Sequence, residues 1–118
     1  MRLVARASTQ ALGRLKTGEM NKTEQAYAKH LDYLKALGEV LWWKFEGIKL
    51  RLADVTFYTA DFGVIVASGE MEIHEVKGWW ADDAKVKIKV AAAMYPFRFC
   101  AVMAKPKKDG GGWGRVDF

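Results

Sequence analysis

The sequence contains little cysteine, little proline and no long hydrophobic run. Cys100 is the single cysteine among 118 residues, which excludes an internal disulfide framework and any zinc site built from several thiolates. The longest apolar stretch, residues 90–104, is interrupted by Pro96 and Arg98. It falls short of the roughly 20 apolar residues that span a bilayer. We therefore expect a soluble, intracellular domain without membrane contact.

Charged residues of both signs are plentiful, but they are unevenly distributed. The chain carries 19 lysine and arginine residues against 14 aspartate and glutamate residues, a formal net charge of +5. Residues 77–108 hold eight basic and two acidic residues, whereas residues 21–76 hold six basic and nine acidic ones. A basic region beside an acidic one favours a polyanionic partner, with some acids reserved for another task. The alternative is that the lysines only maintain solubility.

The length of the chain leaves room for one domain. Residues 1–19 show no sustained periodicity and carry four basic residues and one acidic residue. We expect these residues to form a disordered basic tail that touches nucleic acid, and residues 20–118 to form the folded domain. Met20 is a second candidate for the natural first residue.

The pattern from Asn21 onward predicts a helix. Asn21 is a favourable N-cap and Glu24 follows three residues later, which is the capping-box pattern. The helix is expected over about residues 22–37, with an apolar stripe through Tyr27 and Leu31. Glu24 lies on the same stripe one turn earlier, which places an acid on the core-facing side of the first turn.

Alternating and β-branched stretches follow the helix and predict strands. The strands are expected over residues 40–45, 48–52, 56–66, 71–77 and 97–103, and residues 113–118 form a short tail or an edge strand. Residues 81–94 alternate like a strand at their centre, but their length and their three consecutive alanines favour a helix. Within this series we expect an αβββαβ core, which predicts one layered α/β domain.

Three residues whose side chains can take part in catalysis flank a predicted hairpin turn at residues 67–70. Side chains alternate along a strand, so Glu75 and Lys77 share one face of the second arm. Asp61 stands 14 residues before Glu75 on the first arm. Since the turn brings the two arms alongside each other, we expect Asp61 to lie near Glu75.

Two carboxylates and a backbone carbonyl are hard oxygen donors. Such a set suits Mg²⁺, or Mn²⁺ as its substitute, rather than zinc. A cation held there would neutralise charge in a phosphoryl displacement, and Lys77 would add a fixed positive charge nearby. The alternative interpretation is an ordinary surface Glu–Lys pair on a strand.

The surroundings of these residues combine acids at the centre with a basic rim. Glu24 supplies a third acid from the first helix, and Lys85 and Lys89 share a face of the second helix. The lysines expected to contact a nucleic acid are Lys85, Lys87, Lys89, Lys107 and Lys108. A protein that only binds DNA electrostatically would have no use for central acids, because they repel phosphate.

The order of these motifs resembles that of the PD-(D/E)XK nuclease superfamily, and residues 20–118 resemble a family of small phage-encoded endonucleases. The matching segments are residues 21–24 (NKTE), 57–62 (FYTADF), 74–78 (HEVKG) and 85–89 (KVKIK). The resemblance implies a restriction-endonuclease-like αβββαβ core, a central mixed sheet flanked by helices, and Mg²⁺-dependent cleavage of DNA. It also implies that Asp61 and Glu75 hold the metal, with Lys77 as the catalytic lysine and Glu24 as an auxiliary acid.

One departure from the superfamily pattern is visible. The proline that usually precedes the aspartate is Ala60 here. A proline at this position would stiffen the backbone and carries no reactive group, so we still expect activity.

Several other residues have interpretations that do not involve catalysis. His74 is on the opposite strand face from Glu75, so we expect packing or a surface position. Cys100 is expected to be an inert buried thiol. Asp54 is a candidate fourth acid, although a loop aspartate is the commoner explanation. The adjacent tryptophans Trp42 and Trp43 are interpreted mostly as core residues.

The sequence therefore predicts a Mg²⁺-dependent DNA endonuclease encoded by a phage or prophage and acting in the bacterial host cytoplasm. Branched or structured DNA in replication, recombination or repair is the expected substrate, and a homodimer would suit symmetric cutting of two strands. One alternative is a non-catalytic protein that binds nucleic acid through the same basic face. Another is a structural or assembly protein that binds a protein partner through its tryptophans, among them Trp79 and Trp80.

Overall fold

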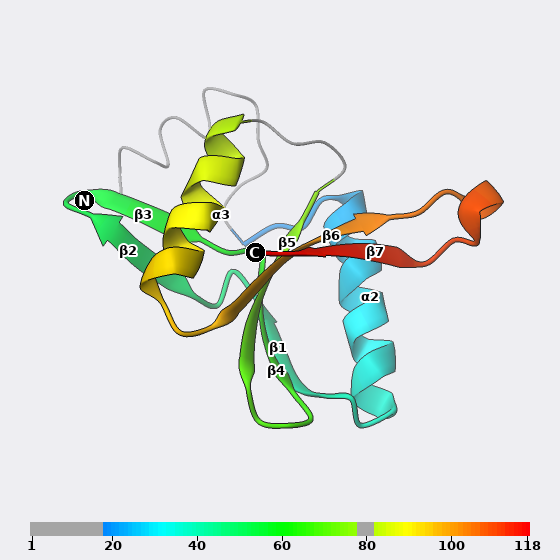
Figure 1. Ribbon diagram of the computed structural model, residues 1–118. Coiled ribbons are helices and arrows are strands. Elements are labelled where there is room, and N and C mark those ends of the chain that lie inside the picture. Colours follow the sequence, from blue (N-terminus) through cyan, green and yellow to red (C-terminus); the bar gives the residue numbers. More distant parts are fainter. Residues whose placement is uncertain (1–17, 78–81) are drawn as a thin grey trace.

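The computed structural model describes residues 18–77 and 82–118 (Figure 1). Most of the expected basic tail, residues 1–19, lies outside the described residues, and so do Trp79 and Trp80. Within the described part, no helix has both the length and the apolar character needed to cross a membrane.

The described residues form two α-helices, seven strands and a short 3₁₀ helix. The helices are α2 (Lys22–Ala36), α3 (Asp82–Met94) and the 3₁₀ helix η1 (Lys107–Asp109). The strands are β1 (Val40–Phe45), β2 (Lys49–Ala53), β3 (Thr56–Thr59), β4 (Phe62–Val66), β5 (Met71–Val76), β6 (Arg98–Ala104) and β7 (Trp113–Asp117). The protein is thus an α/β domain, as the sequence predicts.

Five strands form a central mixed sheet in the order β1-β4-β5-β6-β7. Strands β5 and β6 are parallel and are joined through α3, while the other neighbouring pairs are antiparallel. The predicted hairpin is confirmed, because β4 pairs with β5 in a register that sets Phe62 opposite His74. Residues 113–118 provide an edge strand, β7, rather than a free tail.

The prediction of one strand over residues 56–66 is wrong. This segment is divided between β3, which pairs only with β2 in a separate two-stranded sheet, and β4, which belongs to the central sheet. At the break, the amide of Ala60 donates to the carbonyl of Ile48, and the carbonyl of Asp61 accepts from the amide of Glu46. β-propensity shows that a segment is extended, but it does not show which sheet each part joins.

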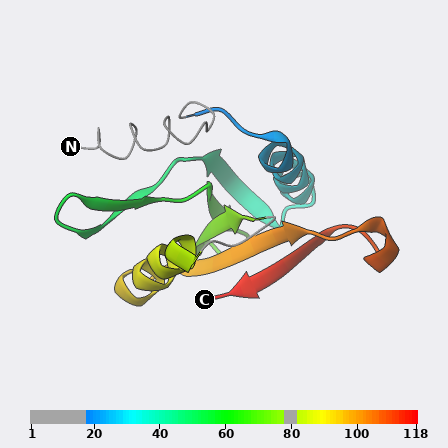
Figure 2. The same ribbon diagram turned by 90° about the horizontal axis from the view of Figure 1, so that it is seen from above.

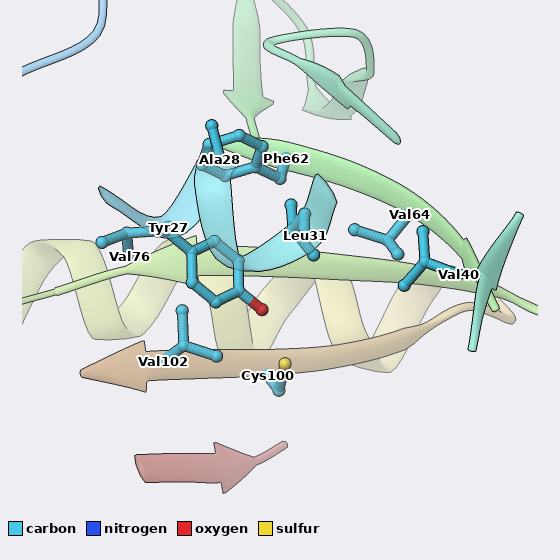
Figure 3. Close-up of a cluster of buried hydrophobic side chains, with 9 residues drawn as sticks. All are labelled: Tyr27, Ala28, Leu31, Val40, Phe62, Val64, Val76, Cys100 and Val102. Carbon is cyan, nitrogen blue, oxygen red and sulfur yellow. The ribbon is translucent and has the colours of Figure 1, made fainter. Parts of the chain in front are cut away.

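Helix α2 covers one face of the central sheet. Its predicted capping box is confirmed: the amide of Glu24 donates to Oδ1 of Asn21 over 2.8 Å, and the amide of Asn21 donates to Oε1 of Glu24 over 2.9 Å. Figure 3 shows Tyr27 and Leu31 of the helix packed over side chains of the sheet. The whole cluster consists of Tyr27, Ala28, Leu31, Val40, Phe62, Val64, Val76, Cys100 and Val102.

Helix α3 and the β2–β3 hairpin cover the opposite face (Figures 1 and 2). Ile88 and Ala91, one helical turn apart, are fully buried there, which resolves the helix-or-strand ambiguity of this segment. The second buried cluster consists of Leu50, Tyr58, Ala60, Ile73, Ile88, Ala91 and Phe99. The central sheet therefore lies between two different layers, and each face has its own core.

The tryptophan pair on β1 is divided between the inside and the outside. Trp43 packs against the α2-side core and donates its indole N–H to Asp32 over 2.9 Å. Trp42 is exposed, so its expected core position is wrong. The reason is the alternation of side chains along a strand, which does not let two consecutive residues enter the same core.

Candidate active site

Strand β5 presents different chemistry on its two faces. Val76 belongs to the α2-side core, whereas Glu75 receives a hydrogen bond from Tyr58 of the hairpin on the other side. Lys77, which follows the strand, places its Nζ 3.2 Å from Oε2 of Glu75. The prediction that Glu75 and Lys77 share a face is therefore confirmed.

Asp61 lies at the turn between β3 and β4, next to the end of β5. Its Oδ2 accepts a hydrogen bond from the amide of Val76 over 2.8 Å, and its own amide points to Oε1 of Glu75 at 3.4 Å. The predicted proximity of Asp61 and Glu75 is confirmed. The break that separates β3 from β4 is what turns the Asp61 side chain toward β5.

Glu75 is almost fully buried, and each of its oxygens has a partner. Oε1 accepts the hydroxyl proton of Tyr58 over 2.5 Å, and Oε2 pairs with Lys77. Burial and the adjacent Glu75 carboxylate raise the pKa of Tyr58, so the phenol remains protonated and acts as a donor. Sequence reasoning missed Tyr58, although its place in the FYTADF segment was the available signal.

The pKa of Asp61 is raised to about 8, first by burial and then by the negative charge of Glu75. The charge of Glu24 raises it further, while the Val76 amide and Lys77 act in the opposite direction. Two carboxylates side by side, one buried and one partly buried, disfavour double ionisation unless a cation compensates them. In the described structure, Lys77 is the cation paired with Glu75.

Glu24 has a double relationship to the site. Its carboxylate is partly exposed and caps the start of α2 through Oε1. Its charge still acts on Asp61. Among the described residues, no three His, Cys, Asp or Glu side chains are close enough together to hold one metal ion. Glu24 therefore acts on Asp61 through its charge. The sequence predicts a core-facing position for Glu24, but its side chain is only partly buried.

Asp61 and Glu75 form a donor pair that fits a hard divalent cation. Oδ2 of Asp61 accepts from the amide of Val76, and Oε1 of Glu75 accepts from the hydroxyl of Tyr58. Carboxylate oxygens are what Mg²⁺ prefers, with waters completing its octahedron. A cation at this position would relieve the repulsion that raises the pKa of Asp61.

Three of the five predicted DNA-contacting lysines lie on helix α3. Lys85, Lys87 and Lys89 are exposed on α3, and Lys87 also donates to the carbonyl of Phe57 on the hairpin at 3.4 Å. Lys107 and Lys108 are exposed in η1, which projects beyond the sheet at a distance from α3 (Figures 1 and 2). They do not form one patch with the α3 lysines.

A second polar network lies on the α2 face of the sheet and was not predicted. The hydroxyl of Tyr27 is 2.6 Å from Nδ1 of His74, whose Nε2 lies 2.8 Å from Glu72, and Arg115 contacts Glu72 at 3.2 Å. These four side chains border a cavity of about 270 Å³ that Trp113 also lines. The network satisfies the buried groups of β5 and links α2 to the β7 edge.

The remaining candidates are placed away from the site. Cys100 is fully buried, and burial raises the pKa of its thiol to about 12, as expected of an inert thiol. Asp54 is exposed in the turn of the β2–β3 hairpin and pairs with Arg51 at 3.4 Å. It is a loop aspartate rather than a fourth acid of the site.

Comparison with known proteins gives no match to this chain among family models, curated proteins or solved structures. The resemblance to PD-(D/E)XK nucleases therefore stays a prediction from the sequence motifs.

Proposed function

We propose that the protein is a Mg²⁺-dependent DNA endonuclease of the PD-(D/E)XK type. The observation that carries the proposal is the desolvated pair Asp61 and Glu75, with Lys77 3.2 Å from Glu75 and a raised pKa at Asp61. Perturbed carboxylates beside a fixed cation are a signature of catalytic sites.

The topology supports this proposal. The elements α2, β1, β4, β5, α3 and β6 follow the order αβββαβ, with the β2–β3 hairpin inserted between β1 and β4 and with β7 added at the edge. Asp61 precedes the second of these three strands and Glu75 stands near the end of the third. This arrangement is consistent with a restriction-endonuclease-like core.

Each residue of the site has a defined task in the proposed reaction. Asp61 and Glu75 would hold Mg²⁺, which when bound would polarise the phosphodiester and lower the pKa of a water. Lys77 stabilises the negative charge that develops on the phosphoryl oxygens and orients the attacking water. Glu24 adds negative charge near Asp61 and so favours a cation at the pair.

The distribution of charge favours DNA as the substrate. The exposed lysines of α3 attract the phosphate backbone, while Asp61 and Glu75 near the end of β5 would only repel it. A non-catalytic binder would gain nothing from such acids. We extend the proposal to branched or structured DNA in phage replication, recombination or repair, with a homodimer cutting both strands.

A substrate panel tests the proposal. The protein is incubated with supercoiled, linear, single-stranded and four-way-junction DNA in Mg²⁺, Ca²⁺ or EDTA. We expect cutting in Mg²⁺ and binding with little cutting in Ca²⁺, whose coordination is larger and looser. Binding that is unchanged by Mg²⁺ or EDTA and never followed by cutting would instead identify a non-catalytic nucleic-acid-binding protein.

A further inference from the structure

The β2–β3 hairpin stands apart from the central sheet, yet it is fixed to the candidate site. Tyr58 on β3 donates to Glu75, and Lys87 of α3 donates to the carbonyl of Phe57. Tyr95, at the end of α3, donates to the carbonyl of Arg51 over 2.6 Å. Three hydrogen bonds therefore hold the hairpin in a defined position beside Asp61 and Glu75.

The two faces of the hairpin differ in character. Leu50 and Tyr58 face inward and belong to the α3-side core. Lys49 and Arg51 point outward and are exposed, and Nζ of Lys49 lies 4.6 Å from the ring centre of Phe57. The outer face thus presents two cations and an aromatic ring, and Arg51 also pairs with Asp54 in the turn at 3.4 Å.

The turn of the hairpin is strained and exposes an apolar side chain. Val55 adopts φ = 53° and is 63% exposed. A β-branched residue in the left-handed region is disfavoured, and glycine or asparagine would fit this turn at lower cost. Such strain persists mainly at functional sites. The exposed position gives Val55 no packing role in the isolated protein.

We propose that the hairpin is a DNA-contacting arm that positions the substrate on the active site. This inference rests on the proposed nuclease function. A two-stranded ribbon fits the major groove of duplex DNA, where an apolar tip can contact base edges. Lys49 and Arg51 would contact the phosphates of that groove, and Val55 would contact the bases.

The length of the arm sets where it touches. Val55 is six residues before Asp61, and at about 3.3 Å per extended residue the tip reaches up to roughly 20 Å from the site. With about 10 base pairs in roughly 35 Å of duplex, the tip lies at most about five or six base pairs from the cut phosphate. The hairpin would therefore select where, within a duplex arm, the site cuts.

Binding measurements in Ca²⁺ test the phosphate contacts. A fluorescent duplex is titrated with the wild type, with the Lys49→Ala/Arg51→Ala variant, and with a control, Lys29→Ala/Lys35→Ala, on the exposed side of α2. Each lost phosphate contact should lower the slope of log affinity against log salt by about 0.9. We expect a lower slope for the hairpin variant and a wild-type slope for the control. Equal slopes in all three proteins would overturn the proposal.

Two changes at the tip test the base contact. Val55→Gly relieves the left-handed strain, so its melting temperature should equal or exceed that of the wild type while DNA binding weakens several-fold. Because Cys100 is buried, a photo-cross-linker should attach to Val55→Cys at position 55 alone. It should react at one place, within about five or six base pairs of the cut. Unchanged binding of Val55→Gly, or cross-links scattered along the duplex, would contradict a defined arm.

The wild type separates this inference from the function on which it rests. A wild type that neither binds nor cuts DNA in the same assays would refute the nuclease proposal, and the arm with it. If the wild type cuts DNA and the hairpin variants bind and cut as well as the wild type, the proposed arm is refuted but the nuclease proposal is not.

Discussion

The hydroxyl of Tyr58 donates to Oε1 of Glu75 over 2.5 Å, and this bond joins the two-stranded sheet to the central one. It has two consequences. It fixes the orientation of a carboxylate that is proposed to hold a metal ion, and it fixes the hairpin relative to the reacting centre. The other oxygen of Glu75 pairs with Lys77, so the carboxylate is held from both sides.

Removing this hydroxyl should impair the metal site more than the fold. Tyr58→Phe keeps the ring in the core but leaves Oε1 of Glu75 without its strongest donor. We expect a loss of about 10- to 100-fold in Mg²⁺ affinity or in rate, as for other groups that orient metal ligands. The loss of stability should be about 1–3 kcal/mol. Two measurements check this: the cleavage rate as a function of Mg²⁺ concentration, and the melting temperature of each protein.

Tyr95→Phe is the matched control for this change. It also removes one hydroxyl hydrogen bond to the hairpin, the exposed bond to the carbonyl of Arg51, but that bond does not involve Glu75. An identical Mg²⁺ dependence in the two variants would show that Tyr58 acts only through the hairpin.

The raised pKa of Asp61 predicts that the metal-free protein loses stability as the pH increases. The folded state retains the proton up to about pH 8, whereas an unfolded aspartate releases it near pH 3.9. Between these values the folded state binds more protons, so the free energy of unfolding falls with rising pH. Asp61→Asn has no carboxyl group to ionise at this position, so its free energy of unfolding does not fall in this way. Its side-chain oxygen can still accept the hydrogen bond from the Val76 amide.

In EDTA, Asp61→Asn should therefore melt above the wild type at pH 8, by about 5 °C for each kcal/mol gained, and by much less at pH 5. Mg²⁺ should raise the melting temperature of the wild type at pH 8 and leave the variant unchanged. Asp32→Asn serves as a control, because asparagine can still accept from Trp43. A melting difference that is the same at both pH values would contradict a buried, destabilising charge at Asp61.

Glu24→Gln separates capping from electrostatics. Glutamine keeps an oxygen for the amide of Asn21, so stability should stay within about 1 kcal/mol of wild type. Loss of the charge should increase the Mg²⁺ concentration needed for half-maximal rate. It should also shift the pH–rate profile to lower pH, because the charge of Glu24 raises the pKa of Asp61. If neither the Mg²⁺ requirement nor the pH profile moves, Glu24 is only a cap.

The lysines of α3 should govern how binding depends on salt. Reversing the charge of Lys85 and Lys89 should weaken binding to all DNA substrates, and each lost contact should lower the log–log salt slope by about 0.9 on duplex DNA. As a control, reversing the charge of Lys29 and Lys35 changes the net charge by the same amount, but on α2, which covers the opposite face of the central sheet. A slope that falls by the same amount in both variants would mean that only net charge matters.

Much of the fold could be predicted because local signals agree with tertiary packing. Asn21 and Glu24 form the capping box that their spacing predicts, and the turn at residues 67–70 closes the hairpin that brings Asp61 to Glu75. In α3, burial of Ile88 and Ala91 follows the helical period. These features depend on neighbours in the sequence or on one turn.

What could not be predicted depends on contacts between distant segments. The break at Ala60 is set by which sheet each half of residues 56–66 joins, and no local propensity encodes that choice. Tyr58 meets Glu75 only because the hairpin folds back over the α3 face. His74 meets Tyr27 across 47 positions of the chain. A sequence pattern with a period of a few residues carries no information about long-range contacts of this kind.

The most direct test of the nuclease proposal is the rate at which supercoiled plasmid is nicked in Mg²⁺ by wild type, Asp61→Asn and the control Asp32→Asn. The predicted result is that the wild type and Asp32→Asn nick the plasmid and that EDTA stops both. The nicking rate with Asp61→Asn should not exceed the rate without protein, although this variant is as stable as the wild type or more so. Nicking by Asp61→Asn at the wild-type rate, or no nicking by the wild type itself, would contradict a catalytic centre at Asp61, Glu75 and Lys77.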